Sequence, residues 1–206
     1  MIAIIDYGRG NLGSVEKAFG RLGMRALVTQ DPRAVEEAEA VVLPGDGAFH
    51  DAMGNLERLG LLNPLRAYLG AGRPFLGICL GYQLLFSESE EFGQGKGLDV
   101  IRGAVRRFPA GLKVPHMGWN QVEHRGDLAI FDGIPSGAHF YFVHSYYPET
   151  PDSSLAVASC TYGVTFPAAI GRGALFATQF HPEKSQRWGI RLLENFAAYV
   201  RGRRSR

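Results

Sequence analysis

The sequence predicts an α/β fold in which helices flank a mainly parallel central sheet with antiparallel strand additions. In the first half of the chain, short apolar runs of strand length alternate with helical patterns. These runs are almost uniformly apolar, as expected for strands that are buried on both faces. Beyond residue 98 the pattern changes to short β-rich segments separated by glycine, proline and aspartate. A length of 206 residues fits one domain over residues 1–206.

Apolar spacing places the elements of the first half. In chain order these are a strand at 2–5, a helix with Val15, Ala18, Phe19 and Leu22 on one face, a strand at 26–29, a helix at 32–38, a strand at 40–43, a long helical stretch to about residue 69, and a strand at 75–78 that leads into a further helix. Asp31 precedes Pro32 and is therefore expected to cap the helix that starts there.

The second half is expected to add antiparallel strands to the parallel core. Predicted β segments are 100–108, 121–122, 138–143, 155–159, 164–170 and 174–180. The last helix carries an apolar stripe that should pack on the sheet, formed by Ile190, Leu193, Phe196, Ala197 and Val200.

Composition excludes several classes of protein. The net charge of +2 supplies no general field for nucleic acid, and the basic run at 201–206 is expected to be a solvated end. Only two cysteines occur, Cys79 and Cys160, which predicts a reducing compartment, the cytoplasm, rather than a disulfide framework. No signal peptide or membrane-spanning run is found. The histidines other than His181 lack metal-ligand spacing, so neither a metal nor a cofactor is expected.

Cys79 occupies the most informative turn of the chain. The apolar run from Phe75 to Ile78 ends at this cysteine, and leucines at helical spacing follow it. Gly77 and Gly81 lie two positions to either side, as in a nucleophile elbow, where a strained strand-to-helix turn exposes the reactive atom. The start of a helix also favours the thiolate form. A small buried core residue remains the alternative for Cys79, and it is the simplest interpretation of Cys160.

A glycine-rich loop follows the first strand. Gly8, Gly10 and Gly13 match the bare spacing of a dinucleotide-binding loop. No convincing acidic strand end lies about 20 residues further on, because Asp31 is already interpreted as a helix cap. Nucleotide binding is therefore not the preferred interpretation.

Three predicted strand ends carry residues suited to acyl transfer. Besides Cys79, these are the loop 44–47 and the His181–Glu183 tripeptide. Ligands of open α/β sheets bind beyond the carboxyl ends of the strands, so the three are expected to meet there. If the tripeptide is extended, Glu183 lies on the same side as His181 and orients it. Cys79 would then be the nucleophile and His181 the proton carrier, with the backbone N–H of Leu80 and the loop 44–47 facing the oxyanion.

Two motifs, Gly77–Gln83 and Gln179–Ser185, resemble those of the class I glutamine amidotransferases. In that family the matching cysteine, histidine and glutamate hydrolyse the side-chain amide of glutamine through a γ-glutamyl thioester. Three further stretches, Asp6–Leu12, Val114–Asn120 and Tyr141–Tyr146, are similar to those of the glutaminase subunits of imidazole glycerol phosphate synthase, in histidine biosynthesis. The resemblance covers nearly the whole chain and favours the catalytic interpretation of Cys79.

The resemblance implies a partner and further site residues. Ammonia would pass to a (β/α)₈-barrel cyclase, bound as a heterodimer, which converts a ribulosylformimino intermediate to imidazole glycerol phosphate and an aminoimidazole carboxamide ribotide. Neither nucleic acid nor membrane is an expected partner. Glutamine and its oxyanion would be held by Gly45, Gly47, Leu80, Gln83, Ser145 and Tyr146. The cyclase would dock on Asn11, Trp119, Asn120 and Lys184, although Trp119 as a core residue is an alternative.

The chain departs from the family at Asp46, where an apolar residue is usual in the oxyanion loop. A carboxylate aimed at a developing oxyanion would oppose it, so this side chain is expected to face away. Two rival interpretations remain. One is a glutaminase for the guanylate, anthranilate or pyridoxal phosphate pathways, which would not be expected to share the 6–12 and 114–120 stretches. The other is a non-catalytic binding module, which would tolerate loss of the cysteine, histidine and glutamate.

Overall fold

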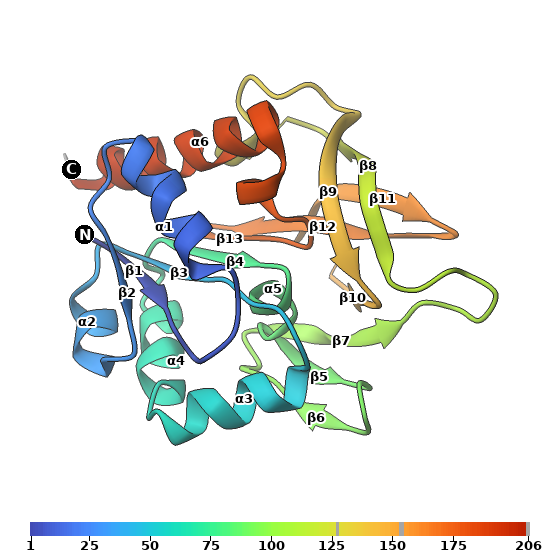
Figure 1. Cartoon of the computed structure of the whole chain (residues 1–206), viewed down its shortest axis with the longest axis horizontal. Coiled ribbons are helices and arrows are strands. Elements are labelled where there is room, and N and C mark those ends of the chain that lie inside the picture. The colour runs from blue at the N-terminus through green and yellow to red at the C-terminus, as the bar shows by residue number, and fades with distance from the viewer. Residues whose placement is uncertain (127, 153–154, 205–206) are drawn as a thin grey trace.

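The computed structural model of the chain describes residues 1–126, 128–152 and 155–204, so the last two residues of the basic run at 201–206 lie outside the described part. A nine-stranded sheet forms its centre, in the order β2-β1-β3-β4-β13-β12-β11-β8-β9 (Figure 1). The parallel strands are β1 Ile2–Ile5, β2 Ala26–Thr29, β3 Ala40–Leu43, β4 Phe75–Ile78 and β13 Leu175–Thr178. The antiparallel additions are β12 Val164–Arg172, β11 Ala156–Tyr162, β8 His116–His124 and β9 Ala138–His144. The predicted α/β architecture is confirmed.

Helices cover both faces of the parallel part of the sheet (Figure 1). One face carries α1 Leu12–Arg21 and α6 Gln186–Arg204, and the other carries α2 Pro32–Glu37, α3 Phe49–Arg58 and α4 Leu62–Gly70. Successive strand residues point to opposite faces, so Ile4 packs in the cluster that contains Phe19, whereas Ile5 packs in the cluster that contains Leu56. Burial on both sides explains why these strands read as continuous apolar runs.

A second sheet was not anticipated from the sequence. It contains β10 Tyr146–Glu149, β7 Ile101–Arg107, β5 Phe86–Ser89 and β6 Gly95–Lys96, in that order. The leucine spacing after Cys79 predicts a helix, yet α5 spans only Leu80–Gln83 before the chain enters β5. Pairing of β5 with β7 selects the strand, because hydrogen bonds to a distant segment override local periodicity.

Two further expectations need adjustment, and a third is confirmed. The helical stretch to residue 69 is two helices, α3 and α4, separated at Gly60, whose φ of +69° ends a right-handed helix. The short segment at 121–122 belongs to the nine-residue strand β8. Asp31 does cap α2, since its side chain accepts the Arg33 N–H at 2.9 Å.

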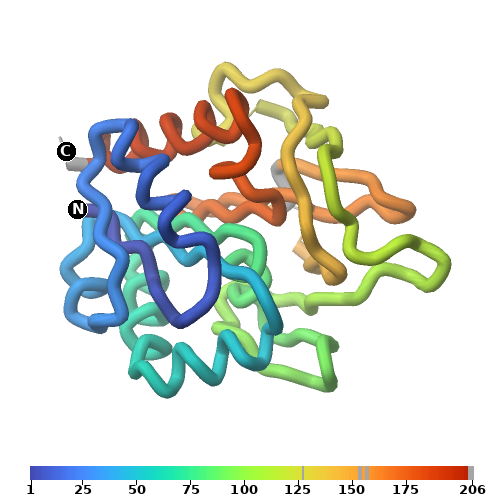
Figure 2. Tube along the Cα trace, in the orientation of Figure 1, coloured from blue at the N-terminus to red at the C-terminus, as the bar shows by residue number. Residues whose placement is uncertain are grey.

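The topology brings the predicted site loops to one edge of the sheet. β3, β4 and β13 are neighbours, with Leu43 paired to Gly77 and Ile78 paired to Thr178. Their carboxyl ends therefore place the loop 44–47, Cys79 and the segment after Thr178 side by side. The loop after β1 also reaches this edge (Figure 2). There the Gly10 N–H donates to Asp46 Oδ1 at 3.0 Å.

None of the helices in the described residues has the length and apolar character needed to cross a membrane. Cys160 is a buried core residue, as expected, and burial raises the pKa of its thiol to about 12.

Candidate active site

Cys79 lies at the predicted sharp turn between β4 and α5. Its φ of 54° and ψ of −107° are unusual for a residue with a side chain. The flanking glycines allow this turn: a Cβ on Gly81 would collide with the Leu43 carbonyl oxygen, and one on Gly77 would lie 2.9 Å from the Gly81 oxygen. The Cys79 N–H donates to Thr178 O at 2.7 Å. Strand, turn and helix thus pack too closely for any larger residue at either glycine.

His181 and Glu183 form a contact, but not through the extended tripeptide that was expected. His181 itself is extended, whereas Pro182–Lys184 forms a 3₁₀ turn, η3, because proline suits the first position of a helical turn. The turn still brings Glu183 Oε1 to 2.8 Å from His181 Nδ1, with both side chains buried. A carboxylate can only accept, so Nδ1 carries the hydrogen and Nε2 is left for other chemistry.

Backbone and hydroxyl contacts hold this histidine in place. The His181 N–H donates to Tyr141 O at 2.9 Å, and Ser185 Oγ donates to His181 O at 2.6 Å. The same Ser185 oxygen accepts the Tyr141 N–H at 2.9 Å. The backbone of His181 is therefore tied to β9, and its ring is tied to Glu183. Its Nε2 is buried and makes no hydrogen bond to the described residues.

The charges around His181 stabilise its protonated form. Burial disfavours the imidazolium, but the Cys79 thiolate and the Glu183 carboxylate outweigh this and raise the pKa of His181 to about 10. Within the described residues the sulfur lies 3.9 Å from Val143 O, to which the thiol form donates, and 3.6 Å from Gln179 Nε2, from which it accepts. The arrangement therefore places a cationic imidazolium beside the sulfur.

A cavity of about 490 Å³ opens in front of Cys79. It is lined by Asp46, Gly47, Cys79, Leu80, Gln83, Glu91, Phe92, Arg107, Pro115, Val143, His144, Ser145 and Tyr146. All of the predicted glutamine-holding residues are therefore at this cavity except Gly45. Glu91 and Arg107 were missed, because they belong to the unpredicted second sheet and its loops and carry no local motif.

Gly45 is not among the residues that line the cavity. A Cβ at this position would collide with the Tyr7 hydroxyl and lie 3.1 Å from Leu80 Cβ. That hydroxyl is buried and has no hydrogen-bond partner among the described residues, and burial raises the pKa of Tyr7. Asp46 lines the cavity, although its Oδ1 is engaged by the Gly10 N–H. The expectation that this carboxylate faces away is therefore met only in part.

The residues expected at a partner interface differ in exposure. Asn11 and Lys184 are exposed, whereas Asn120 is half-buried. Trp119 is 46% exposed, which excludes the alternative that it is a core residue. Met117 is 62% exposed on the same face of β8, and it pairs in register with Val143 at the cavity. An apolar surface therefore adjoins the cavity.

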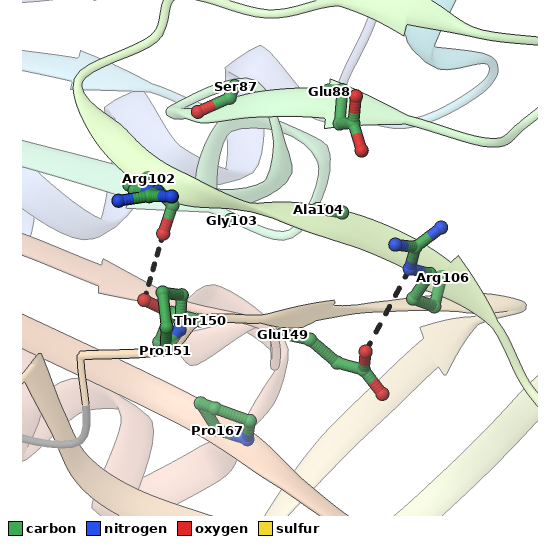
Figure 3. A pocket seen from close by; sticks show the side chains of 10 residues that line it. All are labelled: Ser87, Glu88, Arg102, Gly103, Ala104, Arg106, Glu149, Thr150, Pro151 and Pro167. Carbon is green, nitrogen blue, oxygen red and sulfur yellow. Dashed lines mark hydrogen bonds and ion pairs between the residues drawn. The ribbon is translucent and has the colours of Figure 1, made fainter.

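A different cavity of about 680 Å³ lies over the second sheet and contains none of the predicted site residues (Figure 3). Its polar groups pair with one another. Arg106 lies 3.8 Å from Glu149, and Thr150 Oγ1 donates to Arg102 O at 2.9 Å. It offers no nucleophile beside a base. Among the described residues, no group of three or more His, Cys, Asp or Glu side chains could hold a metal ion.

The fold and the Cys–His–Glu geometry define a glutaminase-like α/β protein, and comparison with known families agrees. Residues 3–199 match the family "Glutamine amidotransferase class-I". The chain belongs to the class I glutamine amidotransferases. A putative GMP synthase subunit from Thermoplasma acidophilum shares the fold, with a TM-score of 0.74 and 23% identity over 99% of this chain and 95% of that one.

More similar relatives carry one name, imidazole glycerol phosphate synthase subunit HisH. The protein from Moorella thermoacetica is 55% identical over 200 residues, which cover 97% of this chain and 95% of the relative. The protein from Geobacter sulfurreducens is 54% identical over 202 residues, which cover 95% of this chain and 97% of the relative. These two relatives and the present chain match over nearly their entire lengths.

Proposed function

We propose that the chain is the glutaminase subunit of an imidazole glycerol phosphate synthase and that Cys79, His181 and Glu183 hydrolyse glutamine. The observation that carries this proposal is the near full-length match, at more than 50% identity, to relatives of that name. The 2.8 Å contact between His181 and Glu183, next to a strained cysteine, supports the chemistry. A non-catalytic module would have no need of these three side chains.

In the first half-reaction the Cys79 thiolate attacks the side-chain amide carbon of glutamine. The carbonyl oxygen becomes an oxyanion, for which backbone N–H groups at Leu80 and in the loop 44–47 are the donors. The C–N bond then breaks, and His181 Nε2 gives its proton to the departing nitrogen, which leaves as ammonia. A γ-glutamyl thioester on Cys79 and a neutral imidazole remain.

Water completes the cycle. His181 Nε2 takes a proton from water while the oxygen attacks the thioester carbon. The C–S bond breaks, which regenerates the thiolate and leaves His181 as the imidazolium. The new γ-carboxyl group then loses its proton to water, and glutamate is released. Glu183 accepts from Nδ1 throughout, so the ring keeps the tautomer and the orientation that both proton transfers need.

The cavity suits the zwitterionic head of free glutamine. Arg107 and Glu91 offer opposite charges at its wall, for the α-carboxylate and the α-ammonium group respectively. Gln83 uses its Nε2 to donate to Tyr146 O at 2.9 Å and to Gln179 Oε1 at 3.0 Å. Only its Oε1 therefore remains for a ligand, which also suits an ammonium donor.

A cyclase partner would receive the ammonia. This chain supplies an amide-hydrolysing site, whereas an acceptor for ammonia has to bind elsewhere. The proposed docking surface is the exposed apolar surface of Met117 and Trp119 beside the cavity. We further propose that the partner is a (β/α)₈ barrel bound as a heterodimer. The cytoplasm, where two free thiols persist, is the proposed compartment.

The test is to measure glutamate production by the chain alone, with the cyclase, and with the cyclase plus its nucleotide substrate. Activity is expected to rise about 5–150-fold or more on assembly, the usual size of allosteric coupling. Cys79→Ser should abolish hydrolysis without loss of complex formation, since the change is nearly isosteric. Full activity of the isolated chain and no complex in size-exclusion chromatography would contradict the synthase assignment and leave a glutaminase of another pathway.

A further inference from the structure

Gln179 contacts the nucleophile from inside the protein. It follows the last residue of β13 and is fully buried, and its backbone N–H donates to Ala168 O at 2.7 Å. Its Nε2 lies 3.6 Å from Cys79 Sγ. The preceding residue, Thr178, accepts the Cys79 N–H, so β13 holds both the backbone and the sulfur of the cysteine. No step of the mechanism above uses this amide.

The hydrogen-bonding partners of Gln179 fix which end of its amide faces the sulfur. The carbonyl of Tyr146 can only accept, so the Gln83 atom 2.9 Å away must be the NH₂ group. That NH₂ group also lies 3.0 Å from Gln179, where its second hydrogen requires an oxygen. The remaining end of the Gln179 amide is therefore its NH₂ group. This end points at Cys79 Sγ as a donor.

The Tyr146 carbonyl also orients a second series of hydrogen-bonded groups. His144 Nδ1 lies 2.8 Å from Tyr146 O and must donate, so its Nε2 accepts from His116 Nδ1 at 3.0 Å. His116 Nε2 then accepts from Asn120 Nδ2 at 3.2 Å, an amide that also donates to Thr161 O at 3.0 Å. Two backbone carbonyls thus anchor a continuous network that ends at the sulfur. A buried and fully oriented network of this kind is rigid.

We propose that Gln179 is a positioning residue that donates a hydrogen bond to the Cys79 sulfur, stabilises its thiolate and aims it at the cavity. This inference rests on the proposed function, in which Cys79 is the nucleophile. A thiolate accepts a hydrogen bond far better than a thiol does, so the donor favours the reactive form. The helix after Cys79 has only four residues, so its dipole is small and a side-chain donor supplies stabilisation that a longer helix would provide.

The experiment follows the alkylation of Cys79 by iodoacetamide against pH, read by peptide mass spectrometry, in two variants. Gln179→Glu is isosteric and can still accept from Gln83, but it turns the donor at the sulfur into a negatively charged acceptor. Gln179→Met removes the polar group and keeps the length of a buried side chain. We expect the midpoint of alkylation to move to higher pH by about one unit or more, which is about tenfold less thiolate below the midpoint.

Glutamine hydrolysis by the complex with the cyclase gives the second readout. The kcat should fall at least about tenfold in both variants while KM changes little, because the lost bond acts on the sulfur and not on the substrate. Gln94→Glu, which adds the same charge at an exposed position, should change neither readout. Thermal unfolding of each variant separates a loss of folding from a loss of thiolate.

An unchanged alkylation profile in the folded variants would overturn the proposal, as would a rise in KM with normal alkylation, which would make Gln179 a substrate-binding residue. The proposed function fails differently. If Cys79→Ser keeps near wild-type hydrolysis, Cys79 is not the nucleophile, whatever the Gln179 variants do.

Discussion

Glu183 is bound to one nitrogen of His181 and leaves the other nitrogen unpaired inside the described part of the protein. This division of roles follows from the chemistry of a carboxylate, which only accepts, and from the turn that places it. The charges around the ring raise the pKa of His181 to about 10, so the imidazole is in its charged form at neutral pH. Glu183 thus fixes which nitrogen faces away from it, and the Cys79 sulfur together with Glu183 raises the pKa of the ring.

The pH profile of hydrolysis should report this pair. The raised pKa of His181, about 10, means that the proton it donates is present below that pH and is lost as pH rises through it. We therefore expect kcat of the complex to fall with a midpoint near pH 10. Glu183→Gln removes the negative charge, so the midpoint should move to lower pH. At neutral pH this variant should lose less kcat than a variant without His181, for which a loss of roughly 10²-fold or more is expected. An alkaline limb that stays in place in this variant would contradict the assigned role.

Arg107 should contribute to substrate binding rather than to chemistry. If it binds the α-carboxylate, Arg107→Gln removes a charge-assisted hydrogen bond, and KM for glutamine should rise about 10–100-fold with kcat little changed. Arg106 is a matched control, since it is adjacent in sequence and is already paired with Glu90 at 3.3 Å and Glu149 at 3.8 Å. Steady-state kinetics of both variants test this. Equal KM values for Arg107→Gln and wild type would remove Arg107 from the site.

At the scale of elements, the β8–β9 pair combines a polar network inside with an apolar surface outside. His116 and His144 face one another across the pair in register, buried among aromatic rings such as Phe108 and Phe142. Burial lowers the pKa of His116 to about 4 and that of His144 to about 3, so both are neutral where they donate and accept. On β9 the alternate residues Phe140, Phe142 and His144 are buried, whereas Tyr141 and Val143 are partly exposed.

These histidines should make the fold sensitive to acid. An unfolded histidine takes up a proton below about pH 6.5, whereas folded His116 stays neutral to about pH 4, so its contribution to stability is lost as pH falls between these values. When the pH falls from about 7.5 to about 5, the free energy of unfolding should drop in both proteins. The drop should be about 2 kcal/mol larger in wild type than in His116→Gln. Urea unfolding at the two pH values measures this difference. The exposed His139→Gln should follow the wild type, and a wild-type-like acid loss in His116→Gln would refute the expectation.

At the scale of the whole molecule, the two edges of the large sheet differ. β2 forms one edge and β9 the other, where β8 and β9 present Met117, Trp119 and Tyr141 next to the cavity. Under the proposed function, ammonia leaving Cys79 would emerge beside this surface, so hydrolysis and docking would share one end of the protein. The opposite edge carries the exposed Leu27 and lies across the sheet from this site.

Docking should depend on Trp119 far more than on Leu27. If Trp119 anchors the cyclase, Trp119→Ala should weaken the complex by about 30-fold or more, the effect of losing an interface hot spot. Leu27→Ala removes an exposed apolar side chain at the far edge and should leave affinity unchanged. Titration calorimetry with the cyclase would compare them. Equal affinities for the two variants would place the interface elsewhere.

Local patterns were enough to determine the parallel half of the fold. The strands at 2–5, 26–29, 40–43 and 75–78 are readable because burial on both faces makes each of them uniformly apolar. The Gly77-x-Cys79-x-Gly81 turn can be recognised in the sequence because only glycine fits where α5 meets β3 and β4. The His181–Glu183 contact was predicted as well, although from an extended backbone that the structure replaces with a 3₁₀ turn.

Tertiary structure alone decided the second sheet and the parts of the site that depend on it. Leu84 and Leu85 continue a helical spacing, but pairing with β7 directs the chain into β5, and this sheet brings Arg107 to the cavity. Gln179 and Gln83 are 96 positions apart, and only the sheet order makes them hydrogen-bond partners beside Cys79. Such contacts have no local periodicity, because their free energy comes from groups that the folded chain brings together. The sequence alone therefore located the proposed nucleophile, and the fold selected the groups that surround it.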